Sequence, residues 1–192
     1  MPLFRKGLGP YALPLAMSGV KLGERLLYVG SGTPALFAAM AAKAGLTGRA
    51  CAIVNGPAEA DAVQRAAARE GVLVEIATGA AGAFPYEADS FDVAVIDSSD
   101  GALGAMSASD RRRTLRETAH AVRPGARVLV IESVRGALGS LLGATSVDAS
   151  YRSSDGAKAA LEEAGFRPVR LLAERERLRF TEGLKPGAAP ST

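Results

Sequence analysis

The chain has 192 residues, 48% of them hydrophobic and 22% charged, and a net charge of +3, as is usual for one soluble globular domain. Its single cysteine, Cys51, excludes an internal disulfide framework. Because His120 is the single histidine, a metal site built from cysteines or histidines is also not expected. No apolar run approaches the roughly 18 residues that a membrane span needs, and glycines and prolines interrupt the N-terminal segment where a secretory signal would be continuously apolar.

Short apolar runs that are typical of strands alternate along the chain with longer runs of helix-forming residues. The first apolar run ends in Gly30-Ser31-Gly32, a tight turn, and Pro34 stands at the first position of the helix expected after it. Strands are predicted over residues 25–30, 49–54, 72–77, 91–96, 126–132, 169–174 and 178–182. Helices are predicted over residues 34–43, 58–70, 109–122 and 154–164, with Ser109 as the N-cap of the third.

The order of these elements predicts the fold. Near-continuous apolar strands that alternate with helices indicate a parallel sheet covered on both faces, and right-handed crossovers make it doubly wound. The last two strands are too close together for a helical crossover, so they must pair antiparallel. We expect one α/β domain over residues 1–192, with a mostly parallel seven-stranded sheet, a C-terminal antiparallel hairpin and helices on both faces. Residues 1–12 and 184–192 are expected to be flexible ends.

The turn after the first strand is the expected ligand site, because open α/β sheets bind ligands outside the carboxyl ends of their strands. The small residues of Gly30-Ser31-Gly32 let a ligand approach the backbone, and the helix that follows offers free N–H groups and a positive dipole end. A Gly-x-Gly pair also occurs in turns that only need positive φ angles. Its place after the first strand of an alternating series favours a binding role.

Four segments together resemble the class I S-adenosylmethionine-dependent methyltransferases, over nearly the whole chain. VKLGERLLYVGSGT (residues 20–33) is similar to their first motif, and FPYEADSFDVAVIDSS (84–99) is similar to their approach to the fourth strand. LRETAHAVRPGARVLVIE (115–132) resembles their passage from a helix through Arg-Pro-Gly into the fifth strand, and AALEEAGFRPVRLLAERERLRFTEG (159–183) resembles their last helix and terminal hairpin. The resemblance implies S-adenosylmethionine as cofactor and methyl transfer as activity.

The chain departs from this family where the family usually has carboxylates. Tyr28 stands at the methionyl end, Asn55 at the ribose end, and Gly79-Ala80 where many members carry Gly-Asp near the adenine. Asn55 still offers neutral hydrogen bonds. Asp97, after the fourth strand, is the remaining carboxylate that faces the crevice, as a ligand for an amino group or as a turn residue. The resemblance thus implies the cofactor-binding residues Tyr28, Gly30, Ser31, Gly32, Asn55, Gly79, Ala80 and Asp97.

The sequence names no catalytic base and no metal ligand. A sulfonium methyl is already activated, so catalysis can come mainly from holding a small-molecule acceptor in line for attack. His120 falls within a predicted helix away from the strand ends, which indicates a structural or surface role. Tyr11, Tyr86 and Tyr151 are candidates for the wall of the acceptor pocket, where an aromatic face favours a sulfonium cation, or else for the core.

Two other functions stay open. Gly30-x-Gly32-x-x-Ala35 also fits the dinucleotide fingerprint of nicotinamide-dependent oxidoreductases. That fingerprint requires an acid about 20 residues on, and the second strand ends without one. The chain could instead be a non-catalytic relative that has lost the cofactor and serves as an interaction module, as the absent carboxylates suggest.

Basic residues are scattered, apart from 111–113 and the alternating Arg175, Arg177 and Arg179, which we predict to share one face of a strand. Neither group forms the broad basic stripe with stacking aromatics that single-stranded nucleic acid requires. We therefore expect a cytoplasmic protein with no nucleic-acid partner and no membrane span. Nothing in the sequence indicates its oligomeric state.

Overall fold

The computed structural model describes residues 11–30, 32–79, 83–134, 148, 151 and 155–187. In these residues seven strands form one sheet in the order β3-β2-β1-β4-β5-β7-β6. The strands are β1 (Arg25–Val29), β2 (Arg49–Val54), β3 (Glu75–Thr78), β4 (Phe91–Ser98), β5 (Val122–Ser133), β6 (Val169–Arg175) and β7 (Leu178–Leu184). The helices are α1 (Ala12–Ser18), α2 (Pro34–Ala44), α3 (Pro57–Glu70), α4 (Ala102–Ala105), α5 (Ala108–Ala121) and α7 (Ala157–Glu163).

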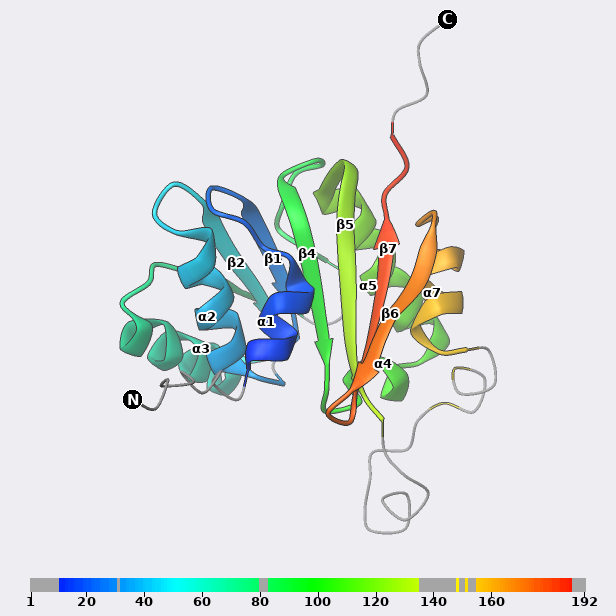
Figure 1. The fold of residues 1–192 in the computed structure, drawn as a ribbon, viewed down its shortest axis with the longest axis horizontal. Helices are drawn as coiled ribbons and strands as arrows, with labels where there is room; N and C mark the ends of the chain where they lie inside the picture. The colour runs from blue at the N-terminus through cyan, green and yellow to red at the C-terminus, as the bar shows by residue number, and fades with distance from the viewer. Residues whose placement is uncertain are drawn as a thin grey trace, which may run out of the picture.

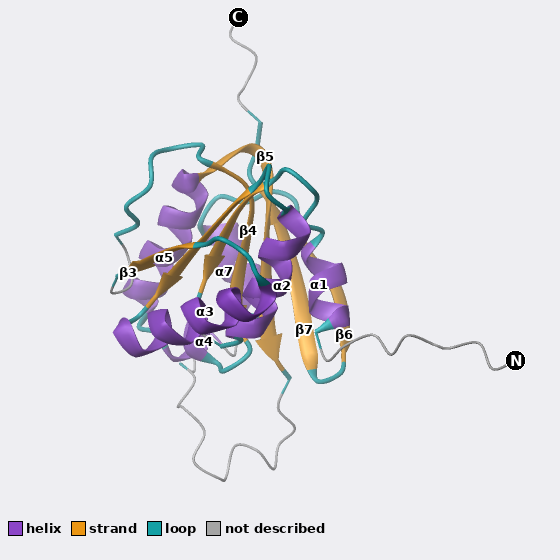
Figure 2. Ribbon diagram, turned by 90° about the vertical axis from the view of Figure 1, so that its left-hand side faces the viewer, coloured by secondary structure: helices purple, strands orange, loops and turns teal. Residues whose placement is uncertain are grey.

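The sheet is wound outwards in two directions from β1. Strands β3, β2, β1, β4 and β5 pair in parallel, and β7 pairs antiparallel with both β5 and β6. Helices α1, α2 and α3 cover one face, and α4, α5 and α7 cover the other (Figure 1, Figure 2). The predicted doubly wound, mostly parallel seven-stranded sheet with its C-terminal antiparallel hairpin is thus confirmed. Since β1 lies between β2 and β4, the strand order reverses there.

The central strands are buried on both faces, which is why their sequences are continuous apolar runs. In β1, Leu26 and Tyr28 pack into the core beneath α2, while Leu27 and Val29 pack into the core beneath α5. Side chains of β4 alternate in the same way, so Asp97 lies on the same face of the sheet as Tyr28. This alternation brings two polar groups together at the end of an apolar sheet.

Several element boundaries differ from those predicted. Helix α5 begins after Ser107, whose hydroxyl oxygen accepts the N–H of Asp110 at 3.1 Å, so the prediction of Ser109 as N-cap is wrong. Strand β5 begins at Val122, upstream of the predicted start, because Val122 pairs with Phe91 of β4. Strand β3 begins later than predicted, at the residue that pairs with Cys51 of β2.

The hairpin between β6 and β7 turns at Glu176 and Arg177, which have left-handed φ angles of 55° and 61°. Arg177 therefore lies in the turn, and the prediction that Arg175, Arg177 and Arg179 share one strand face is wrong. Arg175 instead lies opposite Leu178 in the register of the two strands.

The described part of the chain extends into both predicted flexible ends. Helix α1 starts at Ala12, and the N–H of Lys185 donates to the carbonyl of Ala126 at 2.8 Å, just after β7. Residues 1–10 and 188–192 lie outside the described residues, as does Ser154, the predicted start of the last helix. No helix in the described ranges is both long enough and apolar enough to cross a membrane.

Candidate functional site

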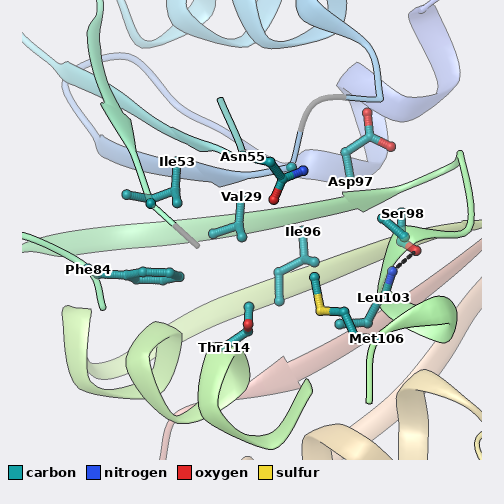
Figure 3. A pocket seen from close by; sticks show the side chains of 13 residues that line it. Val29, Ile53, Asn55, Phe84, Ile96, Asp97, Ser98, Leu103, Met106 and Thr114 are labelled. Atoms are coloured by element: carbon teal, nitrogen blue, oxygen red, sulfur yellow. Dashed lines mark hydrogen bonds between the residues drawn. The ribbon is translucent and has the colours of Figure 1, made fainter. Parts of the chain in front are cut away.

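A pocket of about 460 Å³, part of it open to solvent, lies where the carboxyl ends of β1, β2 and β4 meet (Figure 3). The strand order reverses here, at β1, and an open α/β sheet usually binds its ligand at such a point, outside the carboxyl ends of the strands. Apolar side chains from three strands and from the α4–α5 region form its wall, and few polar groups reach it. The lining residues are Val29, Gly30, Ile53, Asn55, Gly79, Phe84, Ile96, Asp97, Ser98, Ala102, Leu103, Met106 and Thr114.

Four of the predicted cofactor residues line this pocket: Gly30, Asn55, Gly79 and Asp97. Each comes from the end of a different strand, since Gly30 follows β1, Asn55 follows β2, Gly79 follows β3 and Asp97 lies near the end of β4. The fold therefore gathers positions that are up to 67 residues apart, from Gly30 to Asp97. Two further predicted residues, Ser31 and Ala80, lie outside the described residues.

The glycine turn packs directly on the end of β4. Gly30 has a φ of +115°, and a Cβ there would come within 2.5 Å of the backbone oxygen of Asp97. A Cβ on Gly32 would lie 2.9 Å from the Oγ of Ser99 and 3.2 Å from the Oδ1 of Asp97. Glycine at both positions thus lets the turn approach β4 closely and places no side chain against the Asp97 carboxylate.

Asp97 is a buried carboxylate, with 2% of its surface exposed. Its Oδ1 accepts the N–H of Ser99 at 3.0 Å, and its Oδ2 accepts the hydroxyl of Tyr28 at 2.5 Å. Among the described residues, no lysine, arginine or histidine forms an ion pair with it. The pocket therefore contains a negative charge that is hydrogen-bonded but not neutralised by the described part of the chain.

Tyr28 is fully buried, and its ring packs against Phe37 of α2 at 5.1 Å between centroids. Burial, together with the neighbouring charge of Asp97, raises the pKa of Tyr28 well above its ordinary value. The phenol therefore stays protonated and donates to Asp97. With no exposed surface of its own, Tyr28 reaches the pocket through that carboxylate.

Asn55 is exposed at the end of β2, and its backbone N–H donates to the Oε2 of Glu59 at 2.7 Å. Glu59, which the sequence reasoning missed, brings a carboxylate to the end of β2 from the first turn of α3. The sequence position of Glu59 could have revealed it. Glu59 is the third residue of the helix, and a carboxylate at that position often accepts a hydrogen bond from a backbone N–H just before the helix.

A second polar side chain near the end of β4 stabilises the pocket wall. Ser98 is buried on the face opposite to Asp97, and its Oγ accepts the N–H of Leu103 at 2.9 Å (Figure 3). This bond ties α4 to the end of β4, where Leu103 and Met106 complete the apolar wall.

None of the three tyrosines considered for an acceptor wall lines this pocket. The hydroxyl of Tyr151 donates to the Oε1 of Glu132 at 2.6 Å, and Tyr86 packs edge-on against Phe91. Tyr11 packs against the core beneath α2. His120 is exposed in the last turn of α5.

Comparison with known proteins points to one family. A model of the family described as "Methyltransferase domain" matches residues 26–125, which is more than half of the chain. No curated protein matches significantly. Solved structures share the fold at low identity.

A SAM-dependent methyltransferase from Aquifex aeolicus is 18% identical, with a TM-score of 0.70 over 92% of this chain and 90% of that one. An arsenic(III) S-adenosylmethionine methyltransferase from Chlamydomonas reinhardtii is 19% identical, with a TM-score of 0.62 over 90% and 66%. The cyclase SpnF is 19% identical, with a TM-score of 0.66 over 91% and 79%. From the family match, together with this fold, we conclude that the chain belongs to the class I S-adenosylmethionine-dependent methyltransferase family.

Proposed function

We propose that the protein transfers a methyl group from S-adenosylmethionine to a small-molecule acceptor, with the cofactor in the pocket at the ends of β1, β2 and β4. One observation carries this proposal: Gly30, Asn55, Gly79 and Asp97 converge on one pocket from four strand ends. The pocket suits the cofactor chemically, because its apolar wall fits a base and its buried carboxylate fits an ammonium group.

Each part of the pocket has a proposed role. The Gly30–Gly32 turn binds the methionyl part through its backbone, Asn55 binds the ribose through its amide, and the wall near Gly79 and Phe84 packs on the adenine. The cofactor supplies an activated methyl group, so the protein's task is to orient the acceptor and exclude water. We propose no general base.

The non-catalytic alternative has one observation in its favour. Tyr28 and Asn55 replace carboxylates that the family uses for the cofactor, and a fold of this kind does not by itself specify methyl transfer, as the cyclase SpnF illustrates. The two functions differ in one measurable property, which is whether the pocket binds the cofactor product.

The test is a calorimetric titration of the protein with S-adenosylhomocysteine, in parallel with NAD(H) and NADP(H). We expect saturable binding of S-adenosylhomocysteine alone. Gly32→Val should abolish that binding with little change in thermal midpoint, because Gly32 is exposed and lacks a left-handed φ, while a side chain there would collide with the Oγ of Ser99 and crowd the Oδ1 of Asp97. Absence of binding at millimolar ligand would support the non-catalytic alternative, and binding of a nicotinamide cofactor would support an oxidoreductase.

A further inference from the structure

The hydrogen bond between Tyr28 and Asp97 joins two strands at the base of the pocket. Tyr28 lies opposite Val95 in the register of β1 and β4, so Asp97 is one step further along the same face, towards the pocket. The phenol spans that step, and its hydroxyl lies 2.5 Å from Oδ2. The ring cannot move away, because it is fully buried against Phe37. The Asp97 carboxylate is thus held in place by a neutral donor, the hydroxyl of Tyr28, whose ring is fixed by packing.

The Asp97 carboxylate has acceptor capacity left over. An ionised carboxylate offers about four lone-pair sites, and the described residues use one on each oxygen, for Ser99 and for Tyr28. A buried charge without an opposite charge is costly unless a partner arrives. Asp97 lines the pocket, and Gly32 places no side chain against Oδ1, so a small cationic group that enters the pocket can approach this carboxylate although little of its surface is exposed. An ammonium group, with three donors and a positive charge, completes this arrangement.

We propose that Tyr28 is a positioning residue that orients Asp97 to bind the ammonium group of the amino-acid part of the cofactor. The inference rests on the proposed function and assigns to it one charged contact. It also gives a reason for a neutral side chain on β1. A second carboxylate at position 28 would repel that of Asp97, and a cationic side chain there would itself pair with it, whereas a phenol donates a proton and leaves the carboxylate for an external cation.

The experiment uses two ligands that differ only at the amino-acid end. S-adenosylhomocysteine carries the ammonium group, whereas 5′-methylthioadenosine has the same nucleoside and thioether sulfur without it. Tyr28→Phe keeps the ring that packs on Phe37 and removes the hydroxyl. We expect the affinity of Tyr28→Phe for S-adenosylhomocysteine to fall about tenfold or more, and its affinity for 5′-methylthioadenosine to stay at the wild-type value.

Asp97→Asn is the matched variant, since it removes the charge and keeps the size. It should lose affinity for S-adenosylhomocysteine selectively, and the double variant should bind no more weakly than Asp97→Asn alone, because Tyr28 acts through Asp97. Equal losses for both ligands in Tyr28→Phe, or no loss for S-adenosylhomocysteine, would overturn the inference. Failure of the wild type to bind either ligand would overturn the proposed function itself, and the wild-type titrations separate that result from the others.

Discussion

At the scale of single residues, Gly30 meets two demands at one backbone position. Its φ of +115° is one that side chains rarely allow, and a Cβ would come within 2.5 Å of the Asp97 backbone oxygen. Gly71, at the end of α3, meets only the first demand: its φ is +68°, and nothing lies within 4 Å of an added Cβ. A comparison of Gly30 with Gly71 therefore separates the cost of backbone strain from the cost of a collision between an added Cβ and β4.

We predict that Gly30→Ala lowers the free energy of unfolding by more than Gly71→Ala does. Strain alone should cost Gly71→Ala about 1 kcal/mol, whereas Gly30→Ala should cost about 3 kcal/mol because the turn must also move away from β4. Urea unfolding followed by circular dichroism measures both. Gly187→Ala, at an exposed site with free space and no left-handed φ, is the control. Equal losses in Gly30→Ala and Gly71→Ala would show that the turn does not press on β4.

At the scale of an element, the start of α5 depends on one hydroxyl. Ser107 and Ser109 both precede or open the helix, and their Oγ atoms lie 2.9 Å apart. Only Ser107 has the geometry of an N-cap, since its oxygen accepts the N–H of Asp110. The sequence predicted Ser109 as the cap, and the backbone path instead places Ser107 at that position.

We predict that Ser107→Ala destabilises the protein by about 1 kcal/mol, the usual cost of removing an N-cap. Ser109→Ala removes the same atom from the second helical position and should cost less than about 0.5 kcal/mol. Thermal and urea unfolding of the two variants decide between them. A larger loss for Ser109→Ala would restore Ser109 as the functional cap.

At the scale of the whole molecule, the two ends of the parallel strands differ in their polar groups. The pocket lies at the carboxyl ends of the strands, and a cluster of ion pairs around Asp92 lies at their amino ends. This carboxylate accepts bonds from the side chain and backbone N–H of Arg25 and from the guanidinium of Arg123. Asp92 at the start of β4 thus fastens the residues that begin β1 and β5 on either side.

The cluster predicts how stability depends on pH. Hydrogen bonds from Arg25 hold the pKa of Asp92 far below the ordinary value of about 3.9. A lowered folded-state pKa means that the contribution of Asp92 is fully present above about pH 4 and is lost as the pH falls below it. Asp92→Asn should therefore destabilise the protein by about 1–2 kcal/mol at pH 7, a figure that allows for the partial exposure of both arginines. The difference from the wild type should shrink steadily towards pH 2.

Urea unfolding at pH 7, 5, 3 and 2 measures this difference directly. Asp61→Asn, on the exposed side of α3, is the control and should change stability by less than about 0.5 kcal/mol at each pH. A destabilisation by Asp92→Asn that stays constant with pH would mean that packing, rather than charge, is what the carboxylate contributes.

The sequence by itself determined the fold and the edge where the site lies. Burial on both faces leaves an apolar run in each parallel strand, and the turn residues between the runs set the alternation, so the sheet could be predicted from local patterns. The topology explains why four predicted site residues converge, because each comes at or near the carboxyl end of a strand in a parallel sheet. These residues are Gly30, Asn55, Gly79 and Asp97.

Only the tertiary structure decided which side chains meet. Tyr28 and Asp97 are 69 residues apart, and no local pattern records that a phenol on one strand reaches a carboxylate on another. The start of β5 at Val122 likewise depends on pairing with Phe91. Contacts between distant residues form only when packing brings their strands together, whereas a sequence pattern records burial and turns. The chemistry proposed for the pocket therefore depends on contacts between distant residues, whereas the fold around it follows from the pattern of apolar runs and turns in the sequence.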